Sequence, residues 1–393
     1  MRGLTWDHPR GYAPLIAGAP EYEQQHPQLR IQWDRRSLRE FGEAPIEQYV
    51  DRYDLMIVDH PFVGFAARHD ALVDLAPHLS DAEKAHFAHD SVGPSWQSYW
   101  YDGGLWALPI DAATQVASYR PDLLTRFRPE PPRSWEQVFE LGKELRAEGQ
   151  FIIVPACPTD AISLFFTLSA NLGFPVEEGC EVLVNDFVAR EVFDRLHELI
   201  SVAHPRSLDW NPIQVYDFMV SGVEAVYCPY GFGYSNYSRA ERMPRLKFTN
   251  APAAGPRGSG GTMLGGTGVA VSQYSEHQPQ AIAYAKWLVS EGHQRGTYFR
   301  GGGQPASLAA WTDRNLDDAA GAFFSGTFRT LQTAYVRPRF SGFVTFFEAA
   351  GSEINRWLRG ELRDRELFEW LNASYRSQRS SAQPTAATTR RSR

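Results

Sequence analysis

The regular alternation of strand and helix patterns over the first hundred residues constrains the fold of this chain more than any other feature. A strand is expected at 2–6 and a helix within 12–26, and the unbroken apolar run "YDLMIV" (53–58) is typical of a strand buried on both faces. Helix patterns follow at 62–69 and 81–89. Because strands that alternate with helices form parallel sheets covered by helices, the pattern predicts a doubly wound α/β fold.

The length of 393 residues exceeds what one ordinary hydrophobic core accommodates, so we expect two domains. The segment "LWALPIDAATQVASYR" (105–120) has the pattern of two strands joined at "IDAA", which predicts a crossing into the second domain. Ser134 and Gln137 have the spacing of a capping box and predict a helix that continues to Glu148. The other expected helices lie at 45–50, 160–171, 188–202, 212–221, 278–299 and within 316–375, and the other strands at 29–33, 151–156, 223–228 and 268–272.

Composition and charge narrow the class of protein. Hydrophobic residues make up 43% of the chain and charged residues 22%, as in a soluble globular protein. The formal net charge of −7 gives no sign of general binding to nucleic acids or to anionic membranes. Most of the 24 Phe, 17 Tyr and 11 Trp are expected in cores. The stretches "SWQSYWYDGGLW" (95–106) and "YCPYGFGYSNYS" (227–238) mix rings with polar groups, which suits a ligand with apolar patches and many hydroxyls.

Cysteine spacing and the two chain ends bear on location and chemistry. Cys157, Cys180 and Cys228 lack metal-binding or redox spacing, and three buried thiols are favoured over a disulfide. No run of about 18 apolar residues is present. The start "MRGLTW" lacks the charged and apolar regions of a signal peptide, so either a removed signal has been replaced by Met1 or the protein stays in the cytoplasm. The polar segment 376–393 is expected to be a disordered tail.

The triplet Asp-His-Pro begins at Asp7 and again at Asp59, each time after an apolar strand pattern. In open parallel sheets ligands bind beyond the carboxyl ends of strands, so we expect five turns to face one cleft. Aromatic rings would stack on the ligand, carboxylates would accept hydrogen bonds from hydroxyls, and glycines would let the backbone approach closely. The candidate ligand contacts are Trp6, Asp7, His8, Arg10, Asp59, His60, Asp111, Tyr230, Tyr234, Gly266 and Thr267.

His8 and Arg10 add groups that a neutral sugar does not require. A guanidinium beside a helix N-terminus favours a carboxylate or phosphate, because fork geometry and the helix dipole act together. A sugar acid or another acidic metabolite is therefore one interpretation. The alternative is that Arg10 pairs with Asp7 or Asp34 on the surface. The sequence favours neither interpretation over the other.

Metal binding and nucleophilic catalysis are weaker interpretations. Two histidines and three carboxylates from strand ends could bind zinc or iron, but neither triplet has a spacing that places two ligands on one element. Pro after each His is typical of a turn that leads into a helix, with Asp as its cap. No GxSxG motif is present, and "GGTMLGGTG" (260–268) has no phosphate-loop lysine. We therefore expect no catalytic residues, no metal site and no cofactor.

Five segments in order resemble the carbohydrate-type family 1 extracellular solute-binding proteins of ABC importers. They are "YDLMIVDH", "LWALPIDAATQVASYRPDLL", "PPRSWEQVFELGKEL", "FMVSGVEAVYCPYG" and "GGTGVAVSQYSEHQPQAIAYAKWLVSEGHQRGTYFRGGGQPA". The resemblance implies a two-lobed periplasmic-binding-protein-like fold of type II, in which each lobe is a mainly parallel sheet flanked by helices and the ligand cleft lies between the lobes. Lobe one would take 1–111 plus 265–312, and lobe two 112–264 plus 313–375 with the C-terminal helices.

The same resemblance implies a function without chemistry. The protein would close by hinge motion around one carbohydrate or sugar-acid ligand and present it to the subunits of an ABC permease. The hinge would lie near 110–114, 263–267 and 312–316. By the resemblance it would work as a monomer in the periplasm. The alternative is a cytoplasmic relative without a signal, acting as a sensor or as a metal-dependent enzyme on a small metabolite, which the N-terminus and the repeated Asp-His favour.

Overall fold

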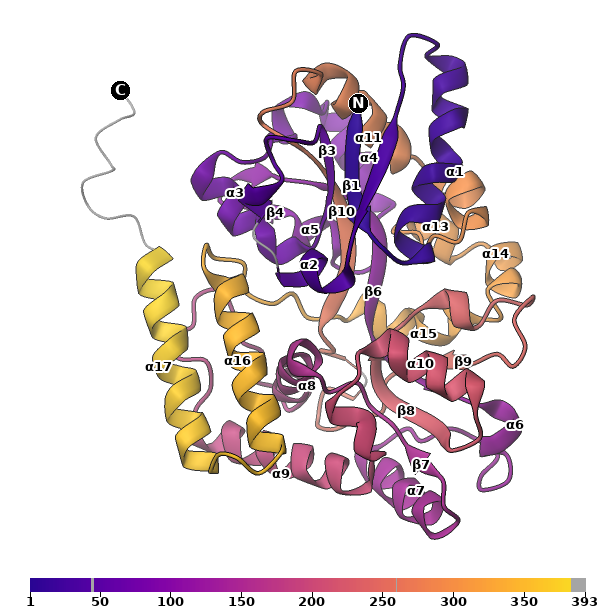
Figure 1. The fold of residues 1–393 in the computed structure, drawn as a ribbon, viewed down its shortest axis with the longest axis vertical. Helices are drawn as coiled ribbons and strands as arrows, with labels where there is room; N and C mark the ends of the chain where they lie inside the picture. The colour runs from indigo at the N-terminus through magenta and orange to yellow at the C-terminus, as the bar shows by residue number, and fades with distance from the viewer. Residues whose placement is uncertain (44–45, 259, 383–393) are drawn as a thin grey trace.

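A single sheet runs through both lobes of the protein in the computed structural model, which describes residues 1–43, 46–258 and 260–382 (Figure 1). The strand order is β2-β1-β3-β10-β6-β8-β7, and β9 pairs with β6. Strands β1, β2 and β3 are parallel, whereas β10 and β6 run antiparallel to their neighbours. The bounds are β1 Arg2–Trp6, β2 Gln32–Arg36, β3 Leu55–Val58, β6 Leu108–Tyr119, β7 Phe151–Ile152, β8 Ala225–Phe232, β9 Lys247–Thr249 and β10 Leu264–Val271, with a separate ribbon of β4 Trp100–Tyr101 and β5 Gly104–Leu105.

Helices cover the sheet in both lobes (Figure 1). The first lobe, the upper one in the figure, carries α1 Pro9–Gln25, α2 Leu38–Glu43, α3 Val63–His69, α4 Asp81–His89, α5 Ser95–Ser98 and α11 Gln278–Leu288. The second lobe carries α6 Pro121–Leu124, α7 Trp135–Ala147, α8 Pro158–Asn171, α9 Asp186–Val202, α10 Pro212–Ser221, α16 Phe343–Leu358 and α17 Asp364–Ala382. Four further helices follow α11 and precede α16 in the chain. They are α12 Glu291–His293, α13 Leu308–Trp311, α14 Arg314–Ala319 and α15 Phe323–Gln332.

Separate hydrophobic cores support the two lobes. Leu55, Ile57 and Val58 of β3 are fully buried in the core of the first lobe, as the run "YDLMIV" predicts. The core of the second lobe includes Phe166 of α8, whose ring lies 6.1 Å from that of Phe343 in α16. The C-terminal helices therefore pack with the second lobe, while the lobe boundaries given above stay a prediction. No helix of the described residues has both the length and the apolar composition needed to cross a membrane.

Two long strands connect the lobes, and here the sequence prediction needs correction. The segment 105–120 contains one twelve-residue strand, β6, and Asp111 lies inside it rather than in a turn. Gly266 and Thr267 lie inside β10 rather than before it, and Tyr230 lies inside β8. Asp111 fits inside β6 because Arg10 pairs with its carboxylate there, and Tyr230 fits inside β8 because its hydroxyl donates to the carbonyl oxygen of Pro252. Of the five turns predicted to face one cleft, only the three that follow β1, β3 and β8 are turns in the structure.

Smaller differences concern the ends of elements. The helix expected over 278–299 is broken, because α11 ends at Leu288 and a new short helix, α12, begins at Glu291. Further along, Gly296 has a non-helical backbone (φ −93°, ψ −115°). The capping box at Ser134 is only half formed, since Gln137 accepts from the backbone N–H of Arg133 instead of Ser134. Strand β7 is shorter than expected and β2 is displaced toward Arg36. Helix α17 continues to Ala382, so 376–382 is helical rather than disordered, and the rest of the expected tail and residues 44–45 lie outside the described residues.

Candidate functional site

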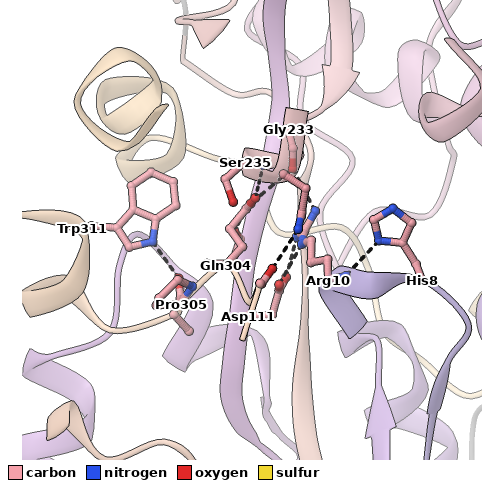
Figure 2. A network of polar contacts seen from close by, with 12 residues as sticks. His8, Arg10, Asp111, Gly233, Ser235, Gln304, Pro305 and Trp311 are labelled. Atoms are coloured by element: carbon pink, nitrogen blue, oxygen red, sulfur yellow. Dashed lines mark hydrogen bonds and ion pairs between the residues drawn. The ribbon is translucent and has the colours of Figure 1, made fainter. Parts of the chain in front are cut away.

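A buried ion pair between Arg10 and Asp111 lies where the two lobes meet (Figure 2). Arg10 Nε donates to Asp111 Oδ2 at 2.8 Å and Nη2 donates to Oδ1 at 2.5 Å, and the two residues are only 3% and 2% exposed. Arg10 Nη1 donates to the carbonyl oxygen of Gly233 at 2.8 Å. Burial acts to lower the pKa of Arg10, but the Asp111 carboxylate outweighs it, so the guanidinium stays charged. One side chain thus joins α1, β6 and the segment after β8.

The structure decides which carboxylate pairs with Arg10, because the two candidates from the sequence, Asp7 and Asp34, each have another partner. Asp7 forms an exposed ion pair with Arg35 at 3.1 Å, and Asp34 pairs with Arg2 at 2.6 Å. The interpretation in which Arg10 pairs with Asp7 or Asp34 on the surface is therefore wrong. Its partner Asp111 lies a hundred residues further along the chain, which sequence spacing does not reveal.

Gln304 holds the same junction together from the other side (Figure 2). Its side-chain oxygen accepts from the backbone N–H of Ser235 at 2.9 Å, and its Nε2 donates to the carbonyl oxygens of Ala112 at 2.7 Å and Gly233 at 3.2 Å. Gln304 is fully buried. The amide therefore links β6, the turn after β8 and the segment that returns toward the second lobe. Gln304 is not among the site residues predicted from the sequence, although its place between "GGG" and Pro305 is typical of a sharp connection.

His8 caps the N-terminus of α1. Its Nδ1 accepts from the backbone N–H of Arg10 at 3.1 Å, and its ring contacts the edge of Tyr234 with centroids 5.0 Å apart. Burial, with the charges of Arg10 and Arg242, lowers the pKa of His8 to about 4, so its imidazole is neutral at pH 7. The expectation that Asp7 is the cap is wrong, because the side chain of Asp7 points to Arg35 at the surface.

A pocket of about 430 Å³ lies between the lobes beside His8. One wall is the start of α1 and the segment Arg300–Gly302, and the other follows β8 and carries Arg239 and Arg242. Arg239 also bridges the junction, because its Nη2 donates to the carbonyl oxygens of Phe299 at 2.8 Å and Gly303 at 3.2 Å. The lining residues are His8, Pro9, Asn236, Tyr237, Arg239, Glu241, Arg242, Arg300, Gly301 and Gly302.

The second Asp-His-Pro triplet is bound by an arginine from the connection between α15 and α16. Asp59 caps a short 3₁₀ helix, as predicted, by accepting from the backbone N–H of His60 at 2.8 Å. Arg337 donates to the other carboxylate oxygen of Asp59 and, through Nε, to His60 Nε2 at 3.3 Å. Burial lowers the pKa of His60 to about 4, an effect that Asp59 partly opposes. Arg337 is not among the site residues predicted from the sequence, where its only signal is its position in the segment "VRPRF".

The two triplets lie at the ends of adjacent strands but have different partners. Strand β1 pairs with β3 in parallel, so both triplets follow the same edge of the sheet, as predicted. His8 contacts Tyr234, whereas the ring of His60 lies 6.5 Å from that of Tyr99. Within the described part of the chain no group of three His, Cys, Asp or Glu side chains could hold a metal ion.

The cysteines match their sequence prediction in part. Cys157, Cys180 and Cys228 form no disulfide with one another in the structure. Only Cys228 is buried, whereas the other two are partly exposed, so the expectation of three buried thiols is wrong for Cys157 and Cys180. Cys157 precedes α8 and Cys180 lies in the connection that follows this helix, so neither belongs to a strand of the sheet as Cys228 does.

Of the predicted aromatic contacts, Tyr234 alone lies at the junction, with its ring centroid 4.4 Å from the Arg10 guanidinium carbon. Tyr230 is fully buried in the core of the second lobe, and its hydroxyl donates to the carbonyl oxygen of Pro252 at 2.8 Å. Trp6 is 4% exposed, because its ring lies against Gly11 and 5.1 Å from the ring of Phe41. The protein itself therefore occupies the rings of Trp6 and Tyr230 in this structure.

Gly266 and Thr267 pair with β6 directly at the ion pair. Thr267 is opposite Asp111 in the ladder and Gly266 is opposite Ala112. Gly266 has a φ of +99°, and a Cβ there would come within 2.3 Å of the carbonyl oxygen of Asp111. Only glycine allows the two crossing strands to approach this closely. The hydroxyl of Thr267 is buried and has no hydrogen-bond partner among the described residues.

Comparisons with known proteins agree with this architecture. The structure of maltose-bound MalE3 from T. maritima superposes with a TM-score of 0.81 at 18% identity, covering 97% of this chain and 99% of the other. A solute-binding protein from Agrobacterium radiobacter in complex with ribitol gives 0.78 at 18% identity, with 97% of each chain covered. The GacH receptor of Streptomyces glaucescens, solved unliganded and with acarbose, gives 0.80 at 18% identity over 98% and 99% of the chains.

Sequence comparison leads to the same group. A probable ABC transporter-binding protein of Deinococcus radiodurans is 22% identical over 308 residues, which cover 72% of this chain and 69% of that protein. The family model described as bacterial extracellular solute-binding protein matches residues 5–295, well over half of the chain. The two-lobed α/β fold is therefore confirmed, and the chain belongs to the bacterial extracellular solute-binding proteins.

Proposed function

We propose that this protein is the solute-binding component of an ABC import system and binds one small carbohydrate or sugar acid between its lobes. The observation that carries the proposal is the buried polar junction at Arg10 and Asp111, which lies beside a pocket formed by both lobes. Solved relatives of the same fold hold maltose, ribitol or acarbose, which are all rich in hydroxyls. Hydroxyls pair well with carboxylates, guanidinium groups and backbone amides of this kind.

The proposed mechanism is hinge closure without any chemical step. The lobes would separate by rotation at 110–114, 263–267 and 312–316, where β6, β10 and the third connection pass between them. Separation would expose polar groups that now satisfy one another across the junction, above all Arg239 with Phe299 and Arg337 with Asp59. A ligand that bridges such groups would favour the closed state, because it binds that state better.

The candidate contacts differ in where they lie relative to the proposed site. His8, Arg10, Asp59, His60, Asp111, Tyr234, Gly266 and Thr267 lie at the junction of the lobes. Asp7 lies at the rim, since its side chain is half exposed beside Arg35. Tyr230 lies outside the proposed site because its hydroxyl is used inside the second lobe. Trp6 has no open ring face, and its buried indole N–H has no hydrogen-bond partner among the described residues.

The partners follow from the family and are part of the proposal. The closed protein would dock as a monomer on the permease subunits of an importer, with both lobes in contact. The working location would be outside the cytoplasmic membrane, as the family description states for its members. The proposal assigns no catalytic residue, no metal and no cofactor to the chain.

A thermal-shift screen of the purified protein against sugars, polyols and sugar acids tests the proposal. A ligand at a thousandfold excess over its Kd stabilises the native state by about 4 kcal/mol and raises the unfolding midpoint clearly. We expect the shift to be lost in Asp111→Asn and kept in Asp34→Asn, a matched control because Asp34 pairs with Arg2 at the surface. A shift with divalent metal ions alone, or with no compound of the panel, would contradict the proposal.

A further inference from the structure

Arg36 is buried without a hydrogen-bonding partner. Of the described arginines, Arg10, Arg36, Arg120 and Arg337 are at most 5% exposed. Arg10 pairs with Asp111, Arg120 pairs with Asp122 at 2.7 Å, and Arg337 pairs with Asp59. No hydrogen bond of ordinary geometry joins the guanidinium of Arg36 to a described residue, although the hydroxyl of Tyr49 lies close enough to favour its charge. Arg36 is therefore the exception in this group.

The surroundings of Arg36 compensate its charge only in part. The guanidinium carbon lies 5.3 Å from the ring centroid of Phe41 and 4.9 Å from that of Tyr49, so ring faces supply some attraction. Glu40, the nearby described carboxylate, is bonded to the backbone N–H and hydroxyl of Ser37. Burial lowers the pKa of Arg36, and Tyr49 and Glu40 offset this only partly. A buried charge in such a place is costly unless an opposite charge arrives from elsewhere.

Trp6 supplies a second unpartnered donor beside Arg36. The two residues end the adjacent parallel strands β1 and β2 and are opposite each other in the ladder. The indole Nε1 of Trp6 is buried and has no hydrogen-bond partner among the described residues. Both side chains contact the ring of Phe41, so they lie on the same side of the sheet. Their position at the carboxyl ends of parallel strands is where open α/β sheets bind ligands.

We infer that Arg36 and the indole N–H of Trp6 bind an oxyanion of the ligand, either a carboxylate or a phosphate. This inference rests on the proposed function and narrows the ligand from carbohydrates in general to acidic sugar derivatives. The guanidinium fork matches the two oxygens of a carboxylate, and the indole N–H donates a third hydrogen bond. The position of Arg10 in the sequence suggested an acidic ligand, but Arg10 is paired with Asp111. We therefore assign the acidic group of the ligand to Arg36.

The alternative is that a carboxylate of the protein itself, rather than the ligand, neutralises Arg36. Glu43 follows Phe41 by two residues, and the structure does not describe its side chain. The two cases predict opposite effects in the ligand-free protein. If the ligand neutralises Arg36, Arg36→Met removes an uncompensated charge and raises the unfolding midpoint. If Glu43 does, Arg36→Met breaks a buried pair and lowers the midpoint, as does Glu43→Gln.

The experiment compares wild type, Arg36→Met, Trp6→Phe and the control Arg35→Met by thermal shift and calorimetry. Arg35 is the matched control because it is the neighbouring arginine, half exposed and paired with Asp7. The probes are glucuronate, galacturonate and gluconate, glucose 6-phosphate as the phosphate arm, and glucose, galactose, glucitol, ribitol and maltose as neutral counterparts. If only glucose 6-phosphate raises the unfolding midpoint, the oxyanion bound by Arg36 is a phosphate. If only the sugar acids raise it, the oxyanion is a carboxylate.

We expect Arg36→Met to unfold at a higher midpoint than wild type without ligand, and to bind the acidic probe at least about tenfold more weakly. Trp6→Phe should weaken binding by about fivefold, and Arg35→Met should leave it unchanged. A lower ligand-free midpoint of Arg36→Met would overturn the inference. So would a neutral sugar that binds wild type and Arg36→Met equally, although the receptor function would then stand. If no probe shifts wild type, the proposed function fails and the inference fails with it.

Discussion

Arg10 and Asp111 form a bidentate ion pair at the junction of the two lobes, although 101 residues separate them in the sequence. Both side chains are buried, and the pair has a further hydrogen bond to the carbonyl oxygen of Gly233. A buried ion pair contributes little net stability but is costly to break on one side only. The pair therefore fixes how α1 meets β6, and it places charge where a ligand between the lobes would lie.

Removing one partner of this pair should destabilise the protein strongly. We expect Asp111→Ala to lower the free energy of unfolding by about 3–5 kcal/mol, because it leaves Arg10 charged and buried. The double variant Arg10→Met with Asp111→Leu should lose less, since no uncompensated charge remains. Urea unfolding followed by circular dichroism measures both. Equal losses in the single and double variants would show that packing, rather than charge, holds this junction.

The pH dependence of stability should report the burial of His60. Burial lowers the pKa of His60 to about 4 in the native state, whereas an unfolded histidine titrates near 6.5. Between about pH 6.5 and pH 4, His60 is therefore protonated in the unfolded state but neutral in the native state. The free energy of unfolding falls as the pH falls through this range. Between pH 7 and 5 this amounts to about 2 kcal/mol.

The variant His60→Gln isolates this contribution. Its free energy of unfolding should fall less than that of wild type between pH 7 and 5, by about 2 kcal/mol, whatever its stability at pH 7. Denaturant titrations at the two pH values give the difference. The control is His78→Gln, which should keep the wild-type slope because His78 is exposed to solvent. Identical slopes in wild type and His60→Gln would exclude His60 as a neutral buried group.

Gly266→Ala should be among the most damaging small substitutions. The φ of +99° and the 2.3 Å approach of a Cβ to the carbonyl oxygen of Asp111 act together, so we expect a loss of about 3 kcal/mol or more. Gly149 also has a positive φ, of +72°, but open space around a Cβ, so Gly149→Ala should lose only about 1 kcal/mol. Thermal unfolding of both variants separates backbone strain from steric clash, and equal losses would contradict this account.

Tyr230 and Tyr234 should differ in function although both were predicted as ligand contacts. Tyr230→Phe removes a buried hydrogen bond to Pro252 and should cost about 1 kcal/mol of stability without changing ligand affinity. Tyr234→Leu removes the ring below the Arg10 guanidinium and should weaken ligand binding. Unfolding free energies and calorimetric affinities of the two variants test this. A weaker ligand affinity of Tyr230→Phe would show that Tyr230 contributes to ligand binding and would contradict this assignment.

The sequence predicts those parts of the fold that have a local signal. The run 53–58 contains β3 because four consecutive apolar residues have no polar face to expose. Asp59 is a helix cap for an equally local reason, since its carboxylate bonds the next backbone N–H. The end of α11 at Leu288 is less visible, because the amphipathic pattern of 278–299 continues past it.

The partners in the site have no local signal, which is why the sequence predicts them poorly. Arg337 reaches Asp59 across 278 residues, and Gln304 bonds Ala112 across 192. Asp111 looks like a turn residue because polar groups are rare in buried strands, yet it lies inside β6 where an arginine from α1 meets it. Such pairings depend on how the strands and helices are arranged in space, and the spacing of residues along the sequence does not show this arrangement.

Small-angle X-ray scattering of the wild-type protein, with and without a saturating ligand from the thermal-shift panel, measures whether the two lobes close on the ligand. We expect a smaller radius of gyration with ligand, because the lobes rotate about β6 and β10 and close on it. The same ligand should leave the radius unchanged in Asp111→Asn. An unchanged radius of the wild-type protein at full saturation would contradict binding by closure of the two lobes.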